Sequence, residues 1–350
     1  MALCYVLHSG NLYGTERMAL ATLTALQKDI TPILLTPNGV VVPHAKKLGI
    51  EVFVFSDTRS LIRVTRQILH CYPRLTFLTT SIKQAMIAWG LNLFYWRIKQ
   101  QIHMVHGGTD EAKSYARKHY LDYLSMPQVV NSQFSYQRLH HYGTKKENIH
   151  VIPNFLPSYY SETVPKRPVF KANSSPPIKK LIIVSRVDKI KRIDLILEAL
   201  SSYPDLHNLH IDIYGTGEML YQYRDHVAKY CPQVTLHGFE KDIPSKLSQA
   251  DALLHLCPVE PFGLVVLEAM AAGLPVIVPD TGGTAELVID DISGFRFTAN
   301  DVDALASCLL AVQQQPVEKL NTIVANARDT LTRRYSTQAC LPHYQRLLKL

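Results

Sequence analysis

Two glutamates separated by seven residues, Glu260 and Glu268, lie where a ligand carrying hydroxyl and phosphate groups could be held. Glu260 lies in a loop that leads into a helix, and its carboxylate can accept hydrogen bonds from hydroxyl groups. That helix is predicted over 264–272, which consists of strong helix formers and is followed by Gly273, a typical C-cap residue. Free amides at the start of such a helix bind phosphate oxygens, and here they belong to Gly263, Leu264 and Val265.

Glu268 lies inside the predicted helix among alanine and leucine neighbours, where a charge needs a partner. A plainer interpretation gives neither glutamate a ligand. Glu260 would then cap the helix, and Glu268 would pair with a surface cation.

Two cations five residues apart, Arg186 and Lys191, follow a predicted strand that begins at Lys180. A helix is expected from about residue 194, so both cations lie in a strand-to-helix loop. Arg186 can bind two oxygens of a diphosphate with its guanidinium fork, and Lys191 can add a point charge. The alternative is a solvated basic loop.

The elements that position these residues alternate between apolar runs and helical patterns. In the second half of the chain, strands are predicted over 252–256, 276–278, 210–214, 234–239 and 294–297. In the first half they are predicted over 1–7, 31–36, 51–55, 75–80, 101–105 and 128–131, with a helix over 18–27. This alternation is typical of parallel sheets, whose functional residues gather at the carboxyl ends of the strands.

Glycine-containing turns follow several of these strands. Gly14 and Thr15 lie in the turn after the first strand, Gly215 and Gly217 follow the strand over 210–214, and Gly238 lies in the strand over 234–239. None of these turns has the G-x-G-x-x-G spacing of a dinucleotide site. His106 follows the strand over 101–105 and precedes Gly107 and Gly108, which leave space beside its ring.

The domain organisation is predicted from a proline-rich interruption. Six of the 20 prolines lie between Pro153 and Pro177, in a stretch without apolar periodicity. We therefore expect a first domain over 1–156, a linker over 157–177, a second domain over 178–335, and a C-terminal helix within 336–350 that packs back towards the first domain.

Composition narrows the class of protein. A chain of 350 residues that is 47% hydrophobic can bury two cores, and its six scattered cysteines form no CxxC pair. The apolar run over 85–98 is too short and too interrupted to cross a membrane. These features favour a cytoplasmic protein.

The net charge of +8 is unevenly distributed. Residues 1–157 hold 17 Lys and Arg against 8 Asp and Glu, whereas residues 158–350 hold 20 against 21. The basic first half could contact an anionic membrane surface, at the inner face of the membrane for a cytoplasmic chain, or it could be a solvated face without a partner. Nucleic acid is not expected, because the sequence contains no motif that reads it.

The sequence around Glu260 and Glu268 resembles the E-x7-E signature of retaining glycosyltransferase family GT4, also described as glycosyl transferases group 1, which has the GT-B fold. Other segments share the resemblance: Ile152-Pro153-Asn154 at the end of the first half, the Arg186–Lys191 loop, and Thr281-Gly282-Gly283 before Glu286. The resemblance implies two Rossmann-like domains facing across a cleft, and a nucleotide-diphosphate sugar, UDP- or GDP-linked, as the donor substrate.

The resemblance also implies roles for individual residues. Arg186 and Lys191 would stabilise the leaving diphosphate, Glu260 would accept hydrogen bonds from the sugar, and His106 would contact the sugar from the first domain. Glu268 would bind the ribose, and the other donor-binding residues would be Gly14, Thr15, Gly215, Gly217, Gly238, Phe262, Gly263, Leu264 and Val265. Anomeric configuration would be retained by front-face attack. No cofactor or metal would be required, because Arg186 and Lys191 would neutralise the diphosphate. Asp301 and Asp303 look like a D-x-D metal motif, but they are better explained as charges at a helix start.

The sequence departs from the family pattern at three positions, and two other functions stay possible alternatives. Tyr13 replaces a glycine of the first turn, while Phe155 and Pro157 replace the glycine and aspartate that usually follow Asn154. A nucleotide-sugar epimerase of the same fold would need no acceptor, and an inactive sugar-nucleotide-binding subunit would keep only the cleft. The acceptor could be a lipid, a polysaccharide or a small molecule.

Overall fold

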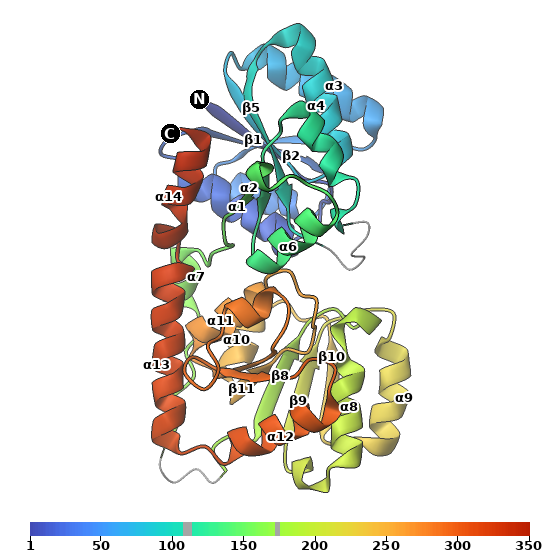
Figure 1. Cartoon of the computed structure of the whole chain (residues 1–350), viewed down its shortest axis with the longest axis vertical. Coiled ribbons are helices and arrows are strands. Elements are labelled where there is room, and N and C mark those ends of the chain that lie inside the picture. Colours follow the sequence, from blue (N-terminus) through green and yellow to red (C-terminus); the bar gives the residue numbers. More distant parts are fainter. Residues whose placement is uncertain (108–113, 172–175) are drawn as a thin grey trace. The chain divides into compact units, whose positions relative to one another are not determined.

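The structure is a computed structural model that describes residues 1–107, 114–171 and 176–350. The chain folds into two units (Figure 1), one of Met1–Pro157 with Thr337–Leu350 and one of Ser158–Ser336. Each unit has a parallel sheet with helices packed against it. The predicted α/β class with two parallel sheets is therefore confirmed.

The first unit contains a seven-stranded sheet in the order β3-β2-β1-β4-β5-β6-β7. Its strands are β1 (Ala2–Val6), β2 (Thr31–Pro37), β3 (Glu51–Phe55), β4 (Leu75–Thr79), β5 (Ile98–Val105), β6 (Gln128–Val130) and β7 (Ile149–Val151). The helices among its described residues are α1 (Gly14–Leu26), α2 (Val41–Lys47), α3 (Thr58–Cys71), α4 (Ile82–Tyr95), α6 (Gln133–His141) and α14 (Thr337–Leu348), with 3₁₀ turns η1 (Lys118–Leu124) and η2 (Lys146–Asn148). Strand order reverses between β1 and β4, which places the loops after these two strands side by side.

The second unit contains a six-stranded sheet in the order β10-β9-β8-β11-β12-β13. Its strands are β8 (Lys180–Val184), β9 (His210–Tyr214), β10 (Val234–Gly238), β11 (Ala252–Leu254), β12 (Val276–Pro279) and β13 (Phe295–Phe297). Its helices are α7 (Ser158–Thr163), α8 (Ile193–Ser202), α9 (Leu220–Tyr230), α10 (Ile243–Ser248), α11 (Leu264–Ala272), α12 (Val302–Gln313) and α13 (Val317–Arg334), with 3₁₀ turns η3 (Lys189–Lys191), η4 (Pro204–Leu206) and η5 (Gly283–Glu286). Here the strand order reverses between β8 and β11.

The first helix begins earlier than its apolar pattern predicted. A capping box explains the difference, because Tyr13 takes the N-cap position and its amide donates to the Glu16 carboxylate over 3.0 Å. Tyr13 has φ −92°, an extended conformation open to any residue. Tyr13 therefore occupies this N-cap position without backbone strain.

The predicted linker over 157–177 differs from the structure over residues 158–171. This stretch forms α7 and then continues as part of the second unit, where Phe170 is buried in the core. The Arg167 guanidinium binds the Asp251 carboxylate at 2.8 Å and lies over the Phe170 ring. Ion pairs and a single buried ring leave no periodic pattern in a sequence, so proline content dominated the prediction. Residues 172–175 lie outside the described residues.

Helix α14 belongs to the first unit and packs against α1. Its Tyr344 ring meets the Phe155 ring edge to face, with centroids 6.3 Å apart. Phe155 is 1% exposed. Phe155 therefore anchors the last helix to the end of the first unit. Among the described residues, no helix is long and apolar enough to cross a membrane.

Removing the Phe155 ring tests this anchor. We expect Phe155→Ala to lower the free energy of unfolding by about 3 kcal/mol, because the change leaves a cavity against Tyr344. Phe94→Ala is the matched control, since that ring is 82% exposed and its loss should cost less than about 0.5 kcal/mol. Urea denaturation measures the free energy of unfolding of both variants. Equal losses in the two would contradict the role of Phe155 as an anchor.

Candidate active site

The second sheet brings two predicted loops together where its strand order reverses. The loop after β8 carries Arg186 and Lys191, and the loop after β11 carries Glu260. Strands β8 and β11 are hydrogen-bonded neighbours although about 70 residues separate them in sequence. Loops at the carboxyl ends of such a strand pair form the usual ligand site of an open parallel sheet.

Lys191 and Glu260 form an ion pair between these loops. The Lys191 ammonium donates to Glu260 Oε2 over 2.5 Å, and the two side chains are only 14% and 19% exposed. Burial alone would lower the pKa of Lys191, but the Glu260 carboxylate raises it above its usual value. Burial alone would raise the pKa of Glu260, but the nearby Lys191 ammonium lowers it below its usual value. Both groups are therefore charged at neutral pH.

His255 was not predicted, yet it faces this ion pair. It directly follows β11, and its Nε2 lies 3.9 Å from Glu260 Oε2, beyond hydrogen-bond distance. Burial lowers its pKa to about 4, because the attraction of Glu260 is outweighed and Lys191 repels the proton further. His255 is thus a neutral, buried polar group beside Glu260. Only its position as the one polar residue within the apolar run over 252–256 could have indicated it from the sequence.

Arg186 lies in the same loop but has another partner. Its guanidinium binds the Asp188 carboxylate at 2.9 Å, and the Arg186 side chain is 47% exposed. The guanidinium is therefore held in place and still open to solvent. A diphosphate would have to share it with Asp188.

Two predicted glycines support the Arg186 loop by close backbone contact. A β-carbon on Gly215 would lie 1.8 Å from the Ser185 carbonyl oxygen, and one on Gly217 would lie 2.2 Å from that of Val187. Gly215 also has φ +142°, which side chains rarely adopt, and it donates to the Gly238 carbonyl over 2.7 Å. These glycines are explained by the packing of β8, β9 and β10 around the loop, whether or not a ligand touches them.

A second glycine contact holds the Glu260 loop. Gly283 donates to the Glu260 carbonyl over 2.7 Å, and a β-carbon on it would lie 2.0 Å from the Pro261 carbonyl oxygen. Gly263 has φ +89° and lies against the Thr284 side chain. The turn predicted at 281–286 is therefore part of the structure that shapes the Glu260 loop.

Helix α11 starts at this loop, as the sequence predicted. Gly263 is its N-cap, so the amides of Leu264 and Val265 lie in its first turn. Phe262 is buried and packs edge to face on Tyr335. Glu268 is 3% exposed, on a helix that is buried over most of its length.

The first unit carries the other predicted site residues. His106 follows β5, and its Nε2 lies 2.9 Å from the Tyr5 hydroxyl. Burial, with a smaller contribution from His8, lowers the pKa of His106 to about 4. Gly14 and Thr15 begin α1. All three are near the carboxyl ends of β1 and β5, while Gly108 lies outside the described residues.

The D-x-D segment has structural partners. Asp301 caps α12 by accepting from the Ala304 amide over 2.9 Å, and Asp303 accepts from the Tyr203 hydroxyl over 2.6 Å. Within residues 1–107, 114–171 and 176–350, no group of three or more His, Cys, Asp or Glu side chains has an arrangement that could hold a metal ion.

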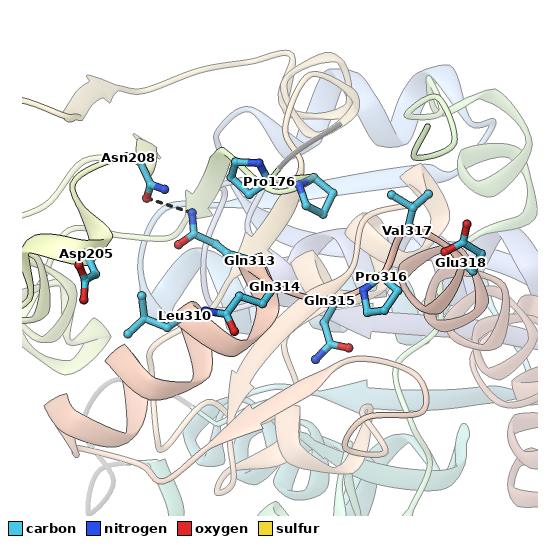
Figure 2. A pocket seen from close by; sticks show the side chains of 11 residues that line it. Pro176, Asp205, Asn208, Leu310, Gln313, Gln314, Gln315, Pro316, Val317 and Glu318 are labelled. Carbon is cyan, nitrogen blue, oxygen red and sulfur yellow. Dashed lines mark hydrogen bonds between the residues drawn. The ribbon is translucent and has the colours of Figure 1, made fainter. Parts of the chain in front are cut away.

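A hollow of about 800 Å³ lies at another part of the second unit (Figure 2). It is lined by residues that precede β8 and β9 and by the α12–α13 connection, so it lies away from the loops at the carboxyl ends. The Gln313 amide on its wall donates to Asn208 Oδ1 over 3.1 Å. The predicted site residues do not line it.

Comparison with known proteins matches residues 167–330 to the family model "Glycosyl transferases group 1". A curated uncharacterized glycosyltransferase of Methanocaldococcus jannaschii is 33% identical over 136 residues, 37% of this chain and 34% of that protein. Glycogen synthase of Mycobacterium tuberculosis is 30% identical over 167 residues, 45% of this chain and 39% of that protein. The matched part thus spans little more than a third of these relatives.

The solved structures extend the likeness to the whole chain. The structure of Anabaena HepE in complex with UDP-glucose has a TM-score of 0.81 and 20% identity, and the alignment covers 100% of both chains. The two parallel α/β units are those of the GT-B fold, which confirms the predicted fold class.

The Lys191–Glu260 ion pair can be tested by a double-mutant cycle. We expect Lys191→Met and Glu260→Gln each to lower the free energy of unfolding by about 2 kcal/mol, because each leaves a largely buried charge uncompensated. The double variant should lose less free energy of unfolding than the two single variants together, by at least about 1 kcal/mol. The control cycle uses Arg333→Met and Asp329→Asn, an exposed pair at 2.7 Å that should couple by less than about 0.5 kcal/mol. Additive losses at Lys191 and Glu260 would contradict the coupling.

The lowered pKa of His255 predicts a specific pH dependence. Between about pH 6.5 and pH 4 the unfolded chain binds a proton at His255 that the folded chain excludes, so stability falls as pH falls. His255→Gln removes this contribution. In that window the free energy of unfolding of the unmodified chain should fall more steeply than that of the variant, by up to about 1.4 kcal/mol per pH unit. Parallel curves from denaturation at several pH values would contradict the prediction.

Proposed function

We propose that this chain is a retaining glycosyltransferase that moves a hexose from a nucleotide-diphosphate sugar to a hydroxyl group of an acceptor. The observation that carries the proposal is the Lys191–Glu260 ion pair at the β8–β11 reversal, with Arg186 in the same loop. The match of residues 167–330 to a glycosyltransferase family supports it. The names of the curated relatives, which include glycogen synthase and a putative colanic acid glycosyltransferase, support a role in polysaccharide or cell-envelope synthesis.

The leaving group determines what the cations do. Transfer of the sugar breaks its bond to the terminal phosphate of the nucleotide diphosphate, on which an additional negative charge develops, and positioned cations stabilise that charge. Arg186 would offer two parallel hydrogen bonds, released in part from Asp188. Lys191 has further ammonium hydrogens besides the one that Glu260 accepts. Two positive side chains at one loop support donor binding without an obligatory metal ion or cofactor.

Glu260 would bind the sugar rather than take a proton. Its lowered pKa keeps the carboxylate ionised, so it accepts hydrogen bonds from hydroxyl groups and is a weak base. We therefore propose front-face attack, in which a donor phosphate oxygen helps to accept the proton of the acceptor hydroxyl. Glu268 would bind the ribose, and the first turn of α11 would face the phosphates.

The first unit would supply the acceptor side. His106 is neutral because of its low pKa, so it would hydrogen-bond to the sugar without adding charge. Gly14 and Thr15 would lie near it at the start of α1. The donor is UDP- or GDP-linked; HepE was solved with UDP-glucose, which makes UDP-glucose the first donor to test. The proposed location is cytoplasmic, with peripheral contact to the inner face of a membrane through the basic first half.

Donor binding can be measured by thermal stabilisation with nucleotide diphosphates and their sugars. A ligand at 100 times its dissociation constant should add about 2.7 kcal/mol to the free energy of unfolding. We expect selective stabilisation by one nucleotide and its sugar, unchanged by a chelator. Stabilisation that the chelator abolishes would contradict metal independence, and no stabilisation by any donor would favour an inactive subunit.

Transfer itself is tested by nucleotide diphosphate release with a panel of acceptors. We expect Glu260→Ala to keep nucleotide diphosphate binding but to lower the transfer rate by about a hundredfold or more, since it removes an interaction with the reacting sugar. Glu198→Gln, an exposed change on α8, is the control and should leave the rate unchanged. An unchanged rate with Glu260→Ala would reject its role, and conversion of the sugar nucleotide without an acceptor would indicate an epimerase.

A further inference from the structure

Helix α4 of the first unit turns an apolar face to the solvent. Met86, Trp89 and Leu93 recur at helical spacing along this face and are 44%, 37% and 52% exposed. Phe94 and Trp96 extend it at the end of the helix, with 82% and 73% exposed. An exposed helix normally carries polar residues on this face. A contiguous set of large apolar side chains there indicates an interaction surface.

The same region of the chain carries positive charge without any acidic residue. Between Asp57 and Asp110 the sequence contains seven Lys and Arg and no Asp or Glu. Three of the cations, Arg59, Arg63 and Arg66, are spaced along α3 and are exposed. Exposed cations also lie on α4 at Lys83, directly after it at Arg97, and at the start of β5 at Lys99.

Helices α3 and α4 lie side by side on one face of the first sheet (Figure 1), where they share a core with β1, β2 and β4. At their N-terminal ends, the Lys83 ammonium donates to the Thr58 hydroxyl. Near their C-terminal ends, the Tyr95 and His70 rings meet edge to face, with centroids 5.0 Å apart. The outward faces of the two helices therefore form one continuous surface, with aromatic and aliphatic side chains beside a row of arginines.

We propose that the outward faces of α3 and α4 dock onto an anionic membrane surface. Tryptophan and phenylalanine side chains favour the interface between lipid headgroups and acyl chains, and nearby cations attract anionic headgroups. A nucleic acid would match the charge but would leave the aliphatic Met86 and Leu93 without an apolar environment. A lipid surface can bind both the apolar and the cationic side chains of the patch.

This inference deepens the proposed peripheral contact by naming the surface that makes it. Docking is measured without donor or acceptor, so its success or failure is distinguishable from that of sugar transfer. A docked α3–α4 surface would keep the first unit at the membrane and would favour an acceptor that is a lipid or is carried by one.

The two tryptophans of the chain, Trp89 and Trp96, both belong to this surface. Tryptophan fluorescence of the full chain therefore reports on it without any label. We expect vesicles of phosphatidylcholine and phosphatidylglycerol to shift the emission to shorter wavelength and to protect it from acrylamide. Vesicles of phosphatidylcholine alone should bind far more weakly, and raised salt should weaken binding to the anionic vesicles.

Two sets of variants test the cationic and the apolar side chains of the patch independently. Arg59→Gln, Arg63→Gln and Arg66→Gln together should weaken binding to anionic vesicles up to about a hundredfold at low salt, since each cation near such a surface contributes about fivefold. Leu93→Ser with Phe94→Ser should weaken binding and reduce the wavelength shift while keeping both tryptophans as probes. These side chains are exposed, so folding should be retained.

Helix α9 supplies matched controls, because it carries the exposed aromatic residues Tyr221 and Tyr230 with Arg224 and Lys229 between them. Tyr221→Ser with Tyr230→Ser, and Arg224→Gln with Lys229→Gln, should leave vesicle binding unchanged. Equal losses of vesicle binding in the control variants and in the α3–α4 variants would overturn the proposal. So would an absence of vesicle binding, binding that leaves both tryptophans open to acrylamide, or self-association that protects them without lipid.

Discussion

The ion pair between Lys191 and Glu260 links the two loops on which the candidate site depends. Each partner lies after a different strand, and the pair exists because β8 and β11 are neighbours where the strand order reverses. Little water reaches either charge, so each is stabilised mainly by the other. The same contact keeps Glu260 ionised and Lys191 protonated, the states required to bind hydroxyl groups and phosphate oxygens.

The surrounding backbone holds this pair by close contacts that only glycine allows. Gly215 and Gly217 let β9 and its loop approach the Arg186 loop, and Gly283 lets η5 approach the Glu260 loop. Neutral His255 completes the buried wall beside Glu260 without adding a competing charge. The loops are thus supported from neighbouring strands, which is how a rigid sheet can present polar side chains from distant segments in one place.

The first unit has two surfaces with different chemistry. The carboxyl ends of β1, β4 and β5 carry polar groups, with His106 bound to Tyr5 and His8 bound to Thr80. The outward face of α3 and α4 is apolar and cationic instead. The uneven charge of the sequence therefore becomes a defined patch in the structure, because both helices pack on the same face of the sheet.

Strand and helix types, the parallel class of the sheets and the helix after Gly263 could be read from the sequence, because apolar periodicity and glycine caps are local properties. The family signature also identified Arg186, Lys191, Glu260 and Glu268 as site candidates. The sequence by itself could not show that Lys191 pairs with Glu260, that Asp188 holds Arg186, or that His255 faces the pair. Those contacts depend on which strands become neighbours, and only the tertiary fold decides that.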